Sequence, residues 1–333
     1  MPPRTPDETY TSQGPNPYVF IVGCMRSGTT LLQRIVDSHP CLAILHELWW
    51  LVKWYKERIG LTPEGLVTPE LVSRLLTFPK FTEKVPIGRE ELEGLLPPGR
   101  PVSFARFMSG IFDWYGRSQG KPLAGDKTPE NVRKLRTLHD LWPNARFVHI
   151  IRDGRDVALS IRNWKEPVKL LRRSATWEED PVTTLALLWE WHVRLGREAG
   201  RALGPGLYYE IRYEALVARP AEECARLCAF LGVPYDDAML RFHEGRVQDD
   251  PGLDAKDAWR PITPGLREWR AQMPVEDVER FEATAGGLLD ELGYPRGCAE
   301  LSPEAVRQAG RVRDLFTRAA RDKYRLPAAW PER

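Results

Sequence analysis

The sequence predicts an α/β fold, in which helices flank a parallel sheet and further helices are inserted between its strands. Short apolar runs typical of buried strands alternate along the chain with amphipathic helical patterns. Two of these runs, Tyr18–Gly23 and Ala145–Ile151, pass through a glycine-containing turn straight into helical patterns at Thr29–Ser38 and Asp153–Asn163. This alternation implies parallel strands joined by right-handed crossovers, with ligands collecting at the carboxyl ends of the strands.

The remaining elements continue the alternation. Further strands are expected at Leu42–Leu45, Pro122–Gly125 and Leu207–Ile211, and further crossover helices at Pro129–Leu141 and Thr183–Ala202. The long interval Trp49–Gln119 is less regular and rich in aromatic residues. We interpret it as helices with proline-rich joins that cover one side of the sheet, since an aromatic stripe is more often core than binding surface.

One large domain is expected over residues 18–300, because no linker-like composition interrupts this part of the chain. Residues 1–17 are rich in proline and are expected to form a flexible lead-in. Residues 301–333 are expected to form a helical tail, since Ser302–Arg325 combines a helical pattern with many arginines. A solvated basic face is the favoured interpretation of this helix, and packing against a second copy in a homodimer is the alternative.

Composition narrows the classes of partner. The formal net charge of +2 gives no reason to expect a nucleic-acid partner. No apolar run approaches the ~18 residues that suggest a membrane span, and Met1–Gln13 carries no apolar signal segment, so a cytoplasmic location is expected. Five cysteines show no metal-like pairing, and Cys224 and Cys228 are expected to form one buried helix face. No cluster of His, Cys, Asp and Glu has ligand spacing, so no metal is expected.

The glycine-rich turn after the first strand predicts a phosphate-binding loop. Gly23–Thr30 has the spacing of the Walker A motif, G-x-x-x-x-G-K-[ST], but Thr29 occupies the lysine position. Because that lysine neutralises the terminal phosphates of a nucleoside triphosphate, its absence argues against ATP or GTP. Backbone N–H groups and the positive end of the following helix still form an anion cradle, and Arg26 adds a cation.

A second anion site is predicted after the strand Ala145–Ile151. Arg152 follows that strand at once, Asp153-Gly154 makes a turn, and Ser160 lies on the next helix. A guanidinium and a hydroxyl in these positions are suited to hold a phosphate. The alternative is an ion pair of Arg152 with Asp156 at the start of the helix, beside a buried serine. Two separate anion sites at one sheet edge suit a nucleotide that carries phosphates at both ends of its ribose.

These motifs resemble those of a known enzyme family. The segments R-S-G-T-T-L-L (Arg26–Leu32) and I-R-D-G-R-D-V-A-L-S (Ile151–Ser160) resemble the 5′- and 3′-phosphate motifs of sulfotransferases that use 3′-phosphoadenosine 5′-phosphosulfate (PAPS). Arg212–Pro220 resembles the R-Y-E-x-L-x-x-x-P stretch of the same family. The similarity extends from about residue 18 to about residue 295 and is greatest to the R-S-G-T-T branch, which includes the tyrosylprotein sulfotransferases.

The resemblance implies a fold, a reaction and a set of binding residues. The fold would be the P-loop-like sulfotransferase fold, and PAPS the co-substrate that donates a sulfuryl group and leaves adenosine 3′,5′-bisphosphate. No metal is needed if arginine and lysine supply the positive charge. The implied nucleotide-binding residues are Arg26, Ser27, Gly28, Thr29, Thr30, Leu31, Arg152, Ser160, Tyr213 and Arg260. Tyr213 would contact the adenine, although a core tyrosine is the alternative, and Arg260 would close over the nucleotide.

Glu47 is the expected general base. It closes the apolar strand that begins at Leu42, and counting forward from Asp37-Ser38-His39-Pro40, which resembles the D-x-H-P pattern of the branch, arrives at the same residue. The alternative is a glutamate that stabilises the start of a helix at Trp49–Lys56. His46 is the competing base, but side-chain alternation along the strand should point it away from Glu47.

Lys127 and Arg26 are expected to stabilise the charge that develops during transfer. Lys127 follows a strand in Gly125–Pro129 and resembles the K-x-P lysine that contacts the transferring group, although a loop lysine paired with Asp126 is the alternative. The acceptor hydroxyl could belong to a metabolite, a glycan, a lipid or a peptide tyrosine. It is expected to be bound by Trp49–Gln119 and Lys165–Pro181.

Two rival functions remain at this point. A P-loop kinase would use the same glycine turn, but Thr29 stands where its lysine would be. A nucleotide-binding scaffold without catalysis would be expected to lack Glu47 or Lys127, and both are present.

Overall fold

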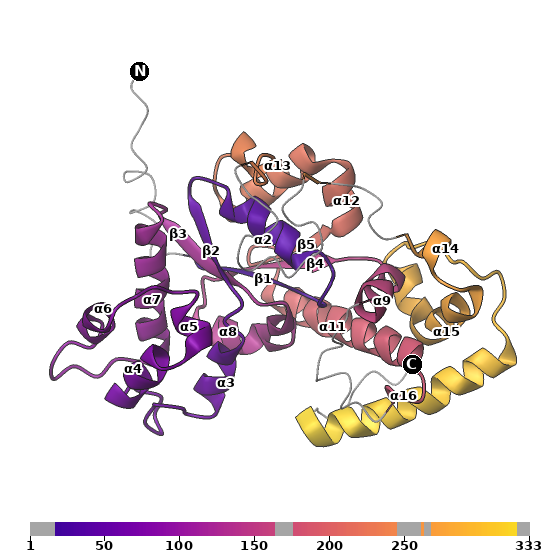
Figure 1. Ribbon diagram of the computed structural model, residues 1–333, viewed down its shortest axis with the longest axis horizontal. Coiled ribbons are helices and arrows are strands. Elements are labelled where there is room, and N and C mark those ends of the chain that lie inside the picture. Colours follow the sequence, from indigo (N-terminus) through magenta and orange to yellow (C-terminus); the bar gives the residue numbers. More distant parts are fainter. Residues whose placement is uncertain (1–16, 164–175, 245–260, 263–267, 325–333) are drawn as a thin grey trace. The chain divides into compact units, whose positions relative to one another are not determined.

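The computed structural model describes residues 17–163, 176–244, 261–262 and 268–324 (Figure 1). Within these residues one sheet contains the strands β1 (Val19–Gly23), β2 (Leu42–His46), β3 (Leu123–Lys127), β4 (Arg146–Ile151) and β5 (Tyr208–Arg212). Their order is β2-β3-β1-β4-β5, and every neighbouring pair is parallel. The predicted α/β fold with a parallel sheet is therefore confirmed.

Two strands extend further than the sequence suggested. β2 and β3 stay paired up to the position where His46 lies opposite Lys127. The apolar pattern had ended at Leu45 and Gly125, because the last residues of both strands are polar or charged. The carboxyl ends of these strands therefore carry side chains that can meet at the edge of the sheet where ligands bind in open α/β folds.

The chain separates into two compact units, residues 1–151 with 196–262 and residues 152–195 with 263–333. The first unit holds the sheet. Its helices are α2 (Thr29–Asp37), α3 (Trp50–Lys56), α4 (Pro69–Leu76), α5 (Pro79–Thr82), α6 (Arg89–Gly94), α7 (Phe104–Ser118), α8 (Leu135–Leu141), α12 (Tyr213–Ala218) and α13 (Pro220–Leu231), with 3-10 turns at Pro129–Lys134 and Asp237–Met239. Helices α3 to α8 cover one face of the sheet, and α2, α12 and α13 cover the other (Figure 1).

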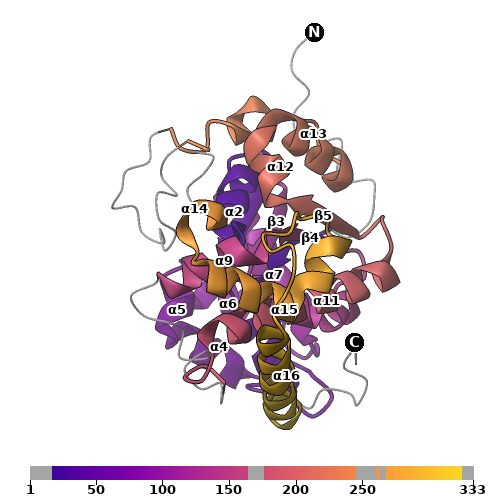
Figure 2. The same ribbon diagram turned by 90° about the vertical axis from the view of Figure 1, so that its right-hand side faces the viewer.

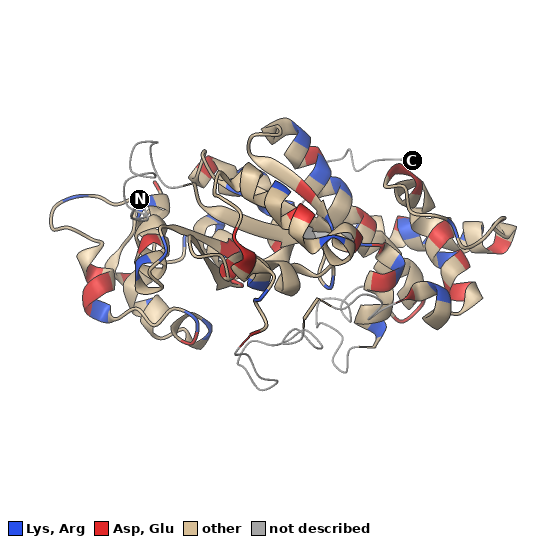
Figure 3. Cartoon of the chain, turned by 90° about the horizontal axis from the view of Figure 1, so that it is seen from above, with Lys and Arg blue, Asp and Glu red and all other residues tan. Residues whose placement is uncertain are grey.

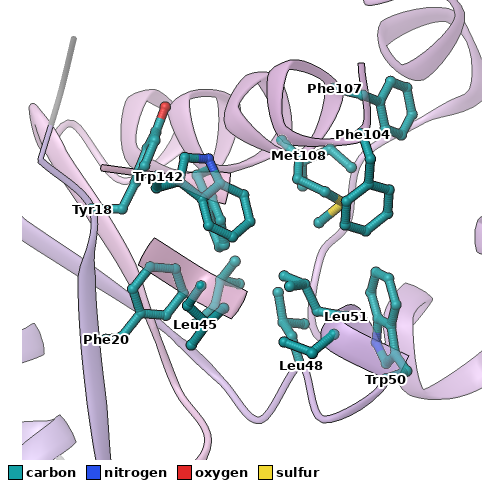
Figure 4. Packing of buried hydrophobic residues seen from close by; sticks show 14 of the residues in the cluster. Tyr18, Phe20, Leu45, Leu48, Trp50, Leu51, Phe104, Phe107, Met108 and Trp142 are labelled. Atoms are coloured by element: carbon teal, nitrogen blue, oxygen red, sulfur yellow. The ribbon is translucent and has the colours of Figure 1, made fainter. Parts of the chain in front are cut away.

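The central strand β1 is buried on both faces. Phe20 and Val22 join a cluster with residues of α3, α4, α7 and α8, while Val19 and Ile21 join a second cluster with residues of α2 and α13. This division follows from the alternation of side chains along a strand. The first cluster is rich in aromatic side chains, and Figure 4 shows Phe20 and Trp142 on one side of it and Phe104 and Trp50 on the other. The aromatic insertion thus contributes to the core, as expected.

The buried cysteines also fill the core. Cys224 and Cys228 lie on α13 and pack in the cluster on the α2 side of the sheet. Both are free thiols. The interpretation of these residues as one buried helix face is confirmed.

The second unit is helical within the described residues. It contains α9 (Gly154–Arg162), α14 (Trp269–Gln272), α15 (Val275–Glu291) and α16 (Pro303–Tyr324), and α11 (Pro181–Leu203) contributes residues to both units (Figure 2). Arg155 on α9 is buried, pairs with Asp153 and with Glu282 of α15, and stacks on Trp269 at 3.6 Å from the ring centroid. This network fixes α9 to α14 and α15.

The basic helix α16 packs within the second unit. Val312 is buried, Arg313 forms an ion pair of 2.8 Å with Glu190, and Arg311 pairs with Glu179. Figure 3 shows Lys and Arg interspersed with Asp and Glu along the helices rather than gathered in one block. Arg311 and Arg313 therefore form ion pairs with carboxylates of the second unit, so the basic face of α16 does not contact solvent alone. A homodimer through this helix stays a prediction, as does the division into a lead-in, one domain and a tail.

None of the helices in the described part of the chain combines the length and the apolar character that a bilayer span requires.

Candidate active site

The glycine loop between β1 and α2 has the backbone of an anion-binding turn. Arg26 and Gly28 both adopt left-handed conformations, with φ of 66° and 93°. Left-handed residues at close spacing build the concave arrangements in which backbone N–H groups bind anions. Gly28 then serves as the N-cap of α2, where Thr29 begins the helix.

The start of α2 suits an anion electrostatically. Gly28 has no side chain with which to cap the helix, and its first turn contains no acidic residue. The positive end of the helix dipole is therefore not neutralised from within the helix. Ser27 and Thr29 are buried, and Thr30 and Leu31 are half-buried. The residues predicted to hold the 5′-phosphosulfate thus form one continuous turn.

Tyr213 lies against this turn. It begins α12, directly after β5, and a Cβ atom built on Gly28 would lie 2.5 Å from Cδ2 of its ring. The side chain is half-buried. The structure therefore brings Tyr213 to the glycine loop, and its contact with an adenine stays a prediction.

Gly28→Ala should lower both stability and nucleotide affinity. Its positive φ alone strains an alanine by ~1 kcal/mol, and the new methyl group would also collide with Tyr213. Gly120→Ala is a matched control, because Gly120 has φ +66° but open space around its Cβ position. Urea unfolding and calorimetry with adenosine 3′,5′-bisphosphate measure the two effects. If the two variants lose the same stability and bind the nucleotide equally well, a methyl group at position 28 is tolerated beside Tyr213. Glycine would then not be required there.

Lys127 contacts both residues that the sequence offered as the general base, Glu47 and His46. Its side chain is fully buried at the end of β3, and its Nζ donates to Oε1 of Glu47 at 2.7 Å. The same Nζ lies 3.0 Å from Nε2 of His46 and 3.4 Å from Oγ1 of Thr30. The end of β2, the end of β3 and the start of α2 therefore converge on one ammonium group. The alternative of a loop lysine paired with Asp126 is wrong.

The expectation that His46 points away from Glu47 is wrong. Nε2 of His46 lies 4.0 Å from Oε1 of Glu47, and both side chains contact Lys127. The cause is the backbone of Glu47, which lies just beyond β2 and has a φ of 57°. Side-chain alternation holds only within an extended strand, and this left-handed residue turns its side chain back to the face of His46.

Glu47 is not the cap of the following helix. The N-cap of α3 is Trp49, which makes no side-chain capping bond, and the Glu47 carboxylate binds Lys127 instead. Burial alone would raise the pKa of Glu47, but the charge and hydrogen bond of Lys127, with smaller contributions from His46 and Lys84, hold it below its ordinary value. The carboxylate is therefore charged at neutral pH. Burial in turn lowers the pKa of Lys127, against the opposing effect of Glu47.

Arg152 and Ser160 lie in the second unit. Arg152 directly precedes the turn into α9, its carbonyl accepts a hydrogen bond of 3.0 Å from Nε1 of Trp189, and its guanidinium lies 3.5 Å from the carboxylate of Asp156. Ser160 is buried on α9. Asp153 caps this helix by accepting from the N–H of Arg155. The ion pair with Asp156 shows that Arg152 has a protein partner, so its role as a phosphate ligand stays a prediction.

Arg260 lies outside the described residues, as does most of Lys165–Pro181.

Among the described residues no group of three or more His, Cys, Asp or Glu side chains is placed to hold a metal ion. The sequence did not identify Lys84, whose Nζ lies 3.4 Å from the carbonyl oxygen of Glu47, because nothing local links residues so far apart.

The chain is similar in sequence and in fold to known proteins. Residues 17–237 match the family model described as the sulfotransferase family. The chain is 27% identical over 286 residues to a protein-tyrosine sulfotransferase of Drosophila melanogaster, which covers 84% of this chain and 52% of that protein. It is 24% identical over 322 residues to protein-tyrosine sulfotransferase A of Caenorhabditis elegans, covering 95% and 75%. It is 27% identical over 322 residues to the nodulation protein NoeE of Sinorhizobium fredii, covering 88% and 68%.

The chain thus spans about half the length of the Drosophila relative and larger parts of the other two. Among solved structures, the sulfotransferase domain from the curacin biosynthetic pathway has the same fold, with a TM-score of 0.58 and 19% identity. That likeness covers 86% of this chain and 99% of the curacin domain. Because the family model matches well over half of the sequence, this chain belongs to the sulfotransferase family.

Proposed function

We propose that the protein transfers a sulfuryl group from PAPS to the hydroxyl group of an acceptor and releases adenosine 3′,5′-bisphosphate. The observation that carries this proposal is the convergence of Glu47, Lys127 and Thr30 beside a glycine loop that lacks the Walker lysine. A carboxylate, a buried cation and an anion-binding helix end are the parts that sulfuryl transfer requires.

The glycine loop would hold the 5′-phosphosulfate. Backbone N–H groups at the start of α2 and the hydroxyl of Thr30 offer hydrogen-bond donors, and the helix dipole favours an anion there. Arg26, in the same loop, can bridge two anionic oxygens through its planar guanidinium. These residues bind and orient the donor, so that the acceptor oxygen can approach the sulfur in line with the leaving phosphate.

Glu47 would accept the proton of the acceptor hydroxyl. In the transfer step the acceptor oxygen forms a bond to sulfur, the bond between sulfur and the 5′-phosphate oxygen breaks, and the acceptor proton moves to Glu47. Lys127 and Arg26 would stabilise the negative charge that passes to the leaving phosphate. His46 remains the second candidate for the base, because it lies beside both Lys127 and Glu47.

The second phosphate of the nucleotide is assigned by sequence motif. We propose that Arg152 and Ser160 contact the 3′-phosphate, that Tyr213 contacts the adenine, and that Arg260 closes over the nucleotide. A cytoplasmic location and a homodimer are likewise proposals. Two of the relatives are named protein-tyrosine sulfotransferases, which makes a tyrosine hydroxyl the first acceptor to test.

Calorimetry distinguishes this proposal from a kinase. Adenosine 3′,5′-bisphosphate should bind tightly without added metal, and ATP should bind weakly with or without Mg²⁺, because Thr29 replaces the lysine that neutralises terminal phosphates. Tighter, Mg²⁺-dependent binding of ATP would favour a P-loop kinase instead.

Arg152→Ala should weaken binding of adenosine 3′,5′-bisphosphate by ~1.5–3 kcal/mol, the range for a hydrogen bond to a charged group. The loss should nearly vanish for adenosine 5′-monophosphate, which lacks the 3′-phosphate. Arg162→Ala is the control, since Arg162 lies on the same helix α9 and is paired with Asp277. Equal losses for both nucleotides in Arg152→Ala would mean that the residue acts only through its pair with Asp156.

A further inference from the structure

Asp126 is a buried carboxylate to which neither the motif nor the proposed reaction gives a role. It lies in β3, directly before Lys127, with none of its surface exposed. Its Oδ1 accepts a hydrogen bond of 2.9 Å from the backbone N–H of Leu48, and its Oδ2 lies 3.5 Å from Nδ2 of Asn131. Burying a charged side chain costs free energy unless hydrogen bonds or opposite charges compensate for the lost water. Here the main hydrogen-bond partner is the backbone N–H of Leu48, next to Glu47.

The backbone of Glu47 is held from several sides. Its left-handed conformation is uncommon for a residue other than glycine and persists only where the surroundings enforce it. Its N–H donates to the carbonyl of Lys127 at 2.8 Å, and its own carbonyl accepts from Nζ of Lys84 at 3.4 Å. The bond from Leu48 to Asp126 fixes the next peptide unit.

Leu48 is also anchored through its side chain. It is fully buried in the aromatic cluster, and Figure 4 shows it beside Leu51 and Trp50. The core thus holds the side chain of Leu48 while Asp126 holds its N–H group. Together they leave the strained turn between β2 and α3 little freedom.

We propose that Asp126 is a positioning residue for sulfuryl transfer, which fixes the turn that carries Glu47 by accepting the N–H of Leu48. The inference rests on the proposed role of Glu47 as the proton acceptor. Asp126 touches neither substrate in this account and acts through the backbone. Its charge also raises the pKa of Lys127, and Asp126→Asn removes that effect while it keeps the acceptor for Leu48. A shift of about 1 Å in a catalytic group can lower the rate about 100-fold, so the loss of this bond should be visible in turnover.

The electrostatics of Asp126 argue against a purely stabilising role. Burial raises its pKa to about 6, against the opposing effects of the Leu48 N–H, Thr128 and Lys127. Since this pKa is higher in the folded than in the unfolded chain, stability falls as the pH rises from the ordinary pKa of an aspartate to about 6, and the loss is complete above that pH. Asp126→Asn should therefore be at least as stable as the parent at pH 8. The side-chain oxygen of Asn131 has no hydrogen-bond partner, so a rotated Asn131 amide can accept from the new amide.

The test compares substitutions that remove or keep the acceptor for Leu48. PAPS turnover is measured with a tyrosine peptide as the acceptor probe, because its phenol keeps its proton at neutral pH and needs the base. Every assay is run below the unfolding temperature of every variant. Asp126→Ala should lower kcat by ~10–100-fold with the KM for PAPS unchanged within about twofold. Asp126→Asn should keep kcat within about threefold, because its Oδ1 still accepts from Leu48. Asp37→Ala is the matched control, since Asp37 likewise accepts a backbone N–H, from Ile44 at 2.9 Å, and should leave kcat unchanged.

A double-mutant cycle shows whether Asp126 acts through Glu47. In a Glu47→Gln background, Asp126→Ala should lower kcat by less than about threefold, because the group that it positions is already disabled. A full additional loss there, or a kcat at the parent level for Asp126→Ala alone, would overturn the proposal. If Glu47→Gln alone keeps the parent activity, the assignment of Glu47 as the base is wrong. If Glu47→Gln loses activity but Asp126→Ala does not, only the positioning role of Asp126 is wrong.

A second variant removes the same bond without changing Asp126. Replacing Leu48 by its α-hydroxy acid analogue exchanges the N–H for an ester oxygen and keeps the buried side chain. It should reproduce the loss of kcat even where Asp126→Ala does not fold. An ester variant that folds and retains the parent kcat would overturn the proposal.

Discussion

Glu47→Gln should lower the turnover number ~10²–10⁴-fold and leave the affinity for adenosine 3′,5′-bisphosphate nearly unchanged. Glutamine keeps the volume of the side chain and can still bind near Lys127, but it cannot accept the proton of the acceptor hydroxyl. The nucleotide does not depend on that proton, so its binding is spared. Steady-state kinetics and calorimetry separate the two effects.

The choice of acceptor sharpens this test. A phenol of low pKa should suffer less in Glu47→Gln than an aliphatic alcohol, because it needs less help to lose its proton. Glu57→Gln is the control, since Glu57 lies at the end of α3 and pairs with Lys53 on the surface. If His46→Asn abolishes turnover while Glu47→Gln leaves it intact, the base is the histidine.

Lys127→Met should lower kcat ~10²–10³-fold, the range observed when one charge-stabilising donor is removed from an active site. Methionine has a similar length, so the buried space of Lys127 stays filled while its charge is lost. Lys56→Met, an exposed change on α3, is the control and should have no effect. A Lys127→Met variant with the parent kcat would remove the lysine from the reaction.

The same substitution should also change the pH dependence. Lys127 is the main reason that the pKa of Glu47 lies below its ordinary value, and burial acts in the opposite direction. Without Lys127 the pKa of Glu47 rises, so the carboxylate is protonated at higher pH. Activity that needs the carboxylate is lost as the pH falls through this pKa, and the acidic limb of the pH–rate profile should move to higher pH. An unmoved limb would show that Glu47 does not titrate as the base.

The elements that the sequence predicted well are those with a strong local pattern. The apolar runs at β1 and β4 and the glycine turn between β1 and α2 are visible in consecutive residues, so their structure follows from periodicity and turn chemistry. Glu47 and Lys127 could be placed at one sheet edge because parallel strands end on the same side. Their direct contact of 2.7 Å could not be deduced, since it depends on the register of β2 with β3.

The parts that the sequence did not predict depend on backbone geometry and distant partners. His46 was assigned to the wrong face because Glu47 has a left-handed φ. A residue other than glycine rarely adopts this conformation, so the sequence gives no sign of it. Asp126 was considered only as a partner of Lys127, although a carboxylate within an otherwise buried strand is itself a signal of a specific partner. Its bond to Leu48 joins residues that lie 78 positions apart, which no local pattern reveals.

The most direct test of the proposed function follows the sulfuryl group itself. Incubation with PAPS labelled with ³⁵S and a panel of hydroxyl acceptors, including 4-nitrophenol, a tyrosine peptide, a sugar and a sterol, should move the label to at least one acceptor. Adenosine 3′,5′-bisphosphate should appear in equal amount, and Glu47→Gln should slow the formation of both products, least with 4-nitrophenol. Label that stays in PAPS with every acceptor, together with transfer of a ³²P-labelled phosphoryl group from ATP to one of them, would contradict the assignment.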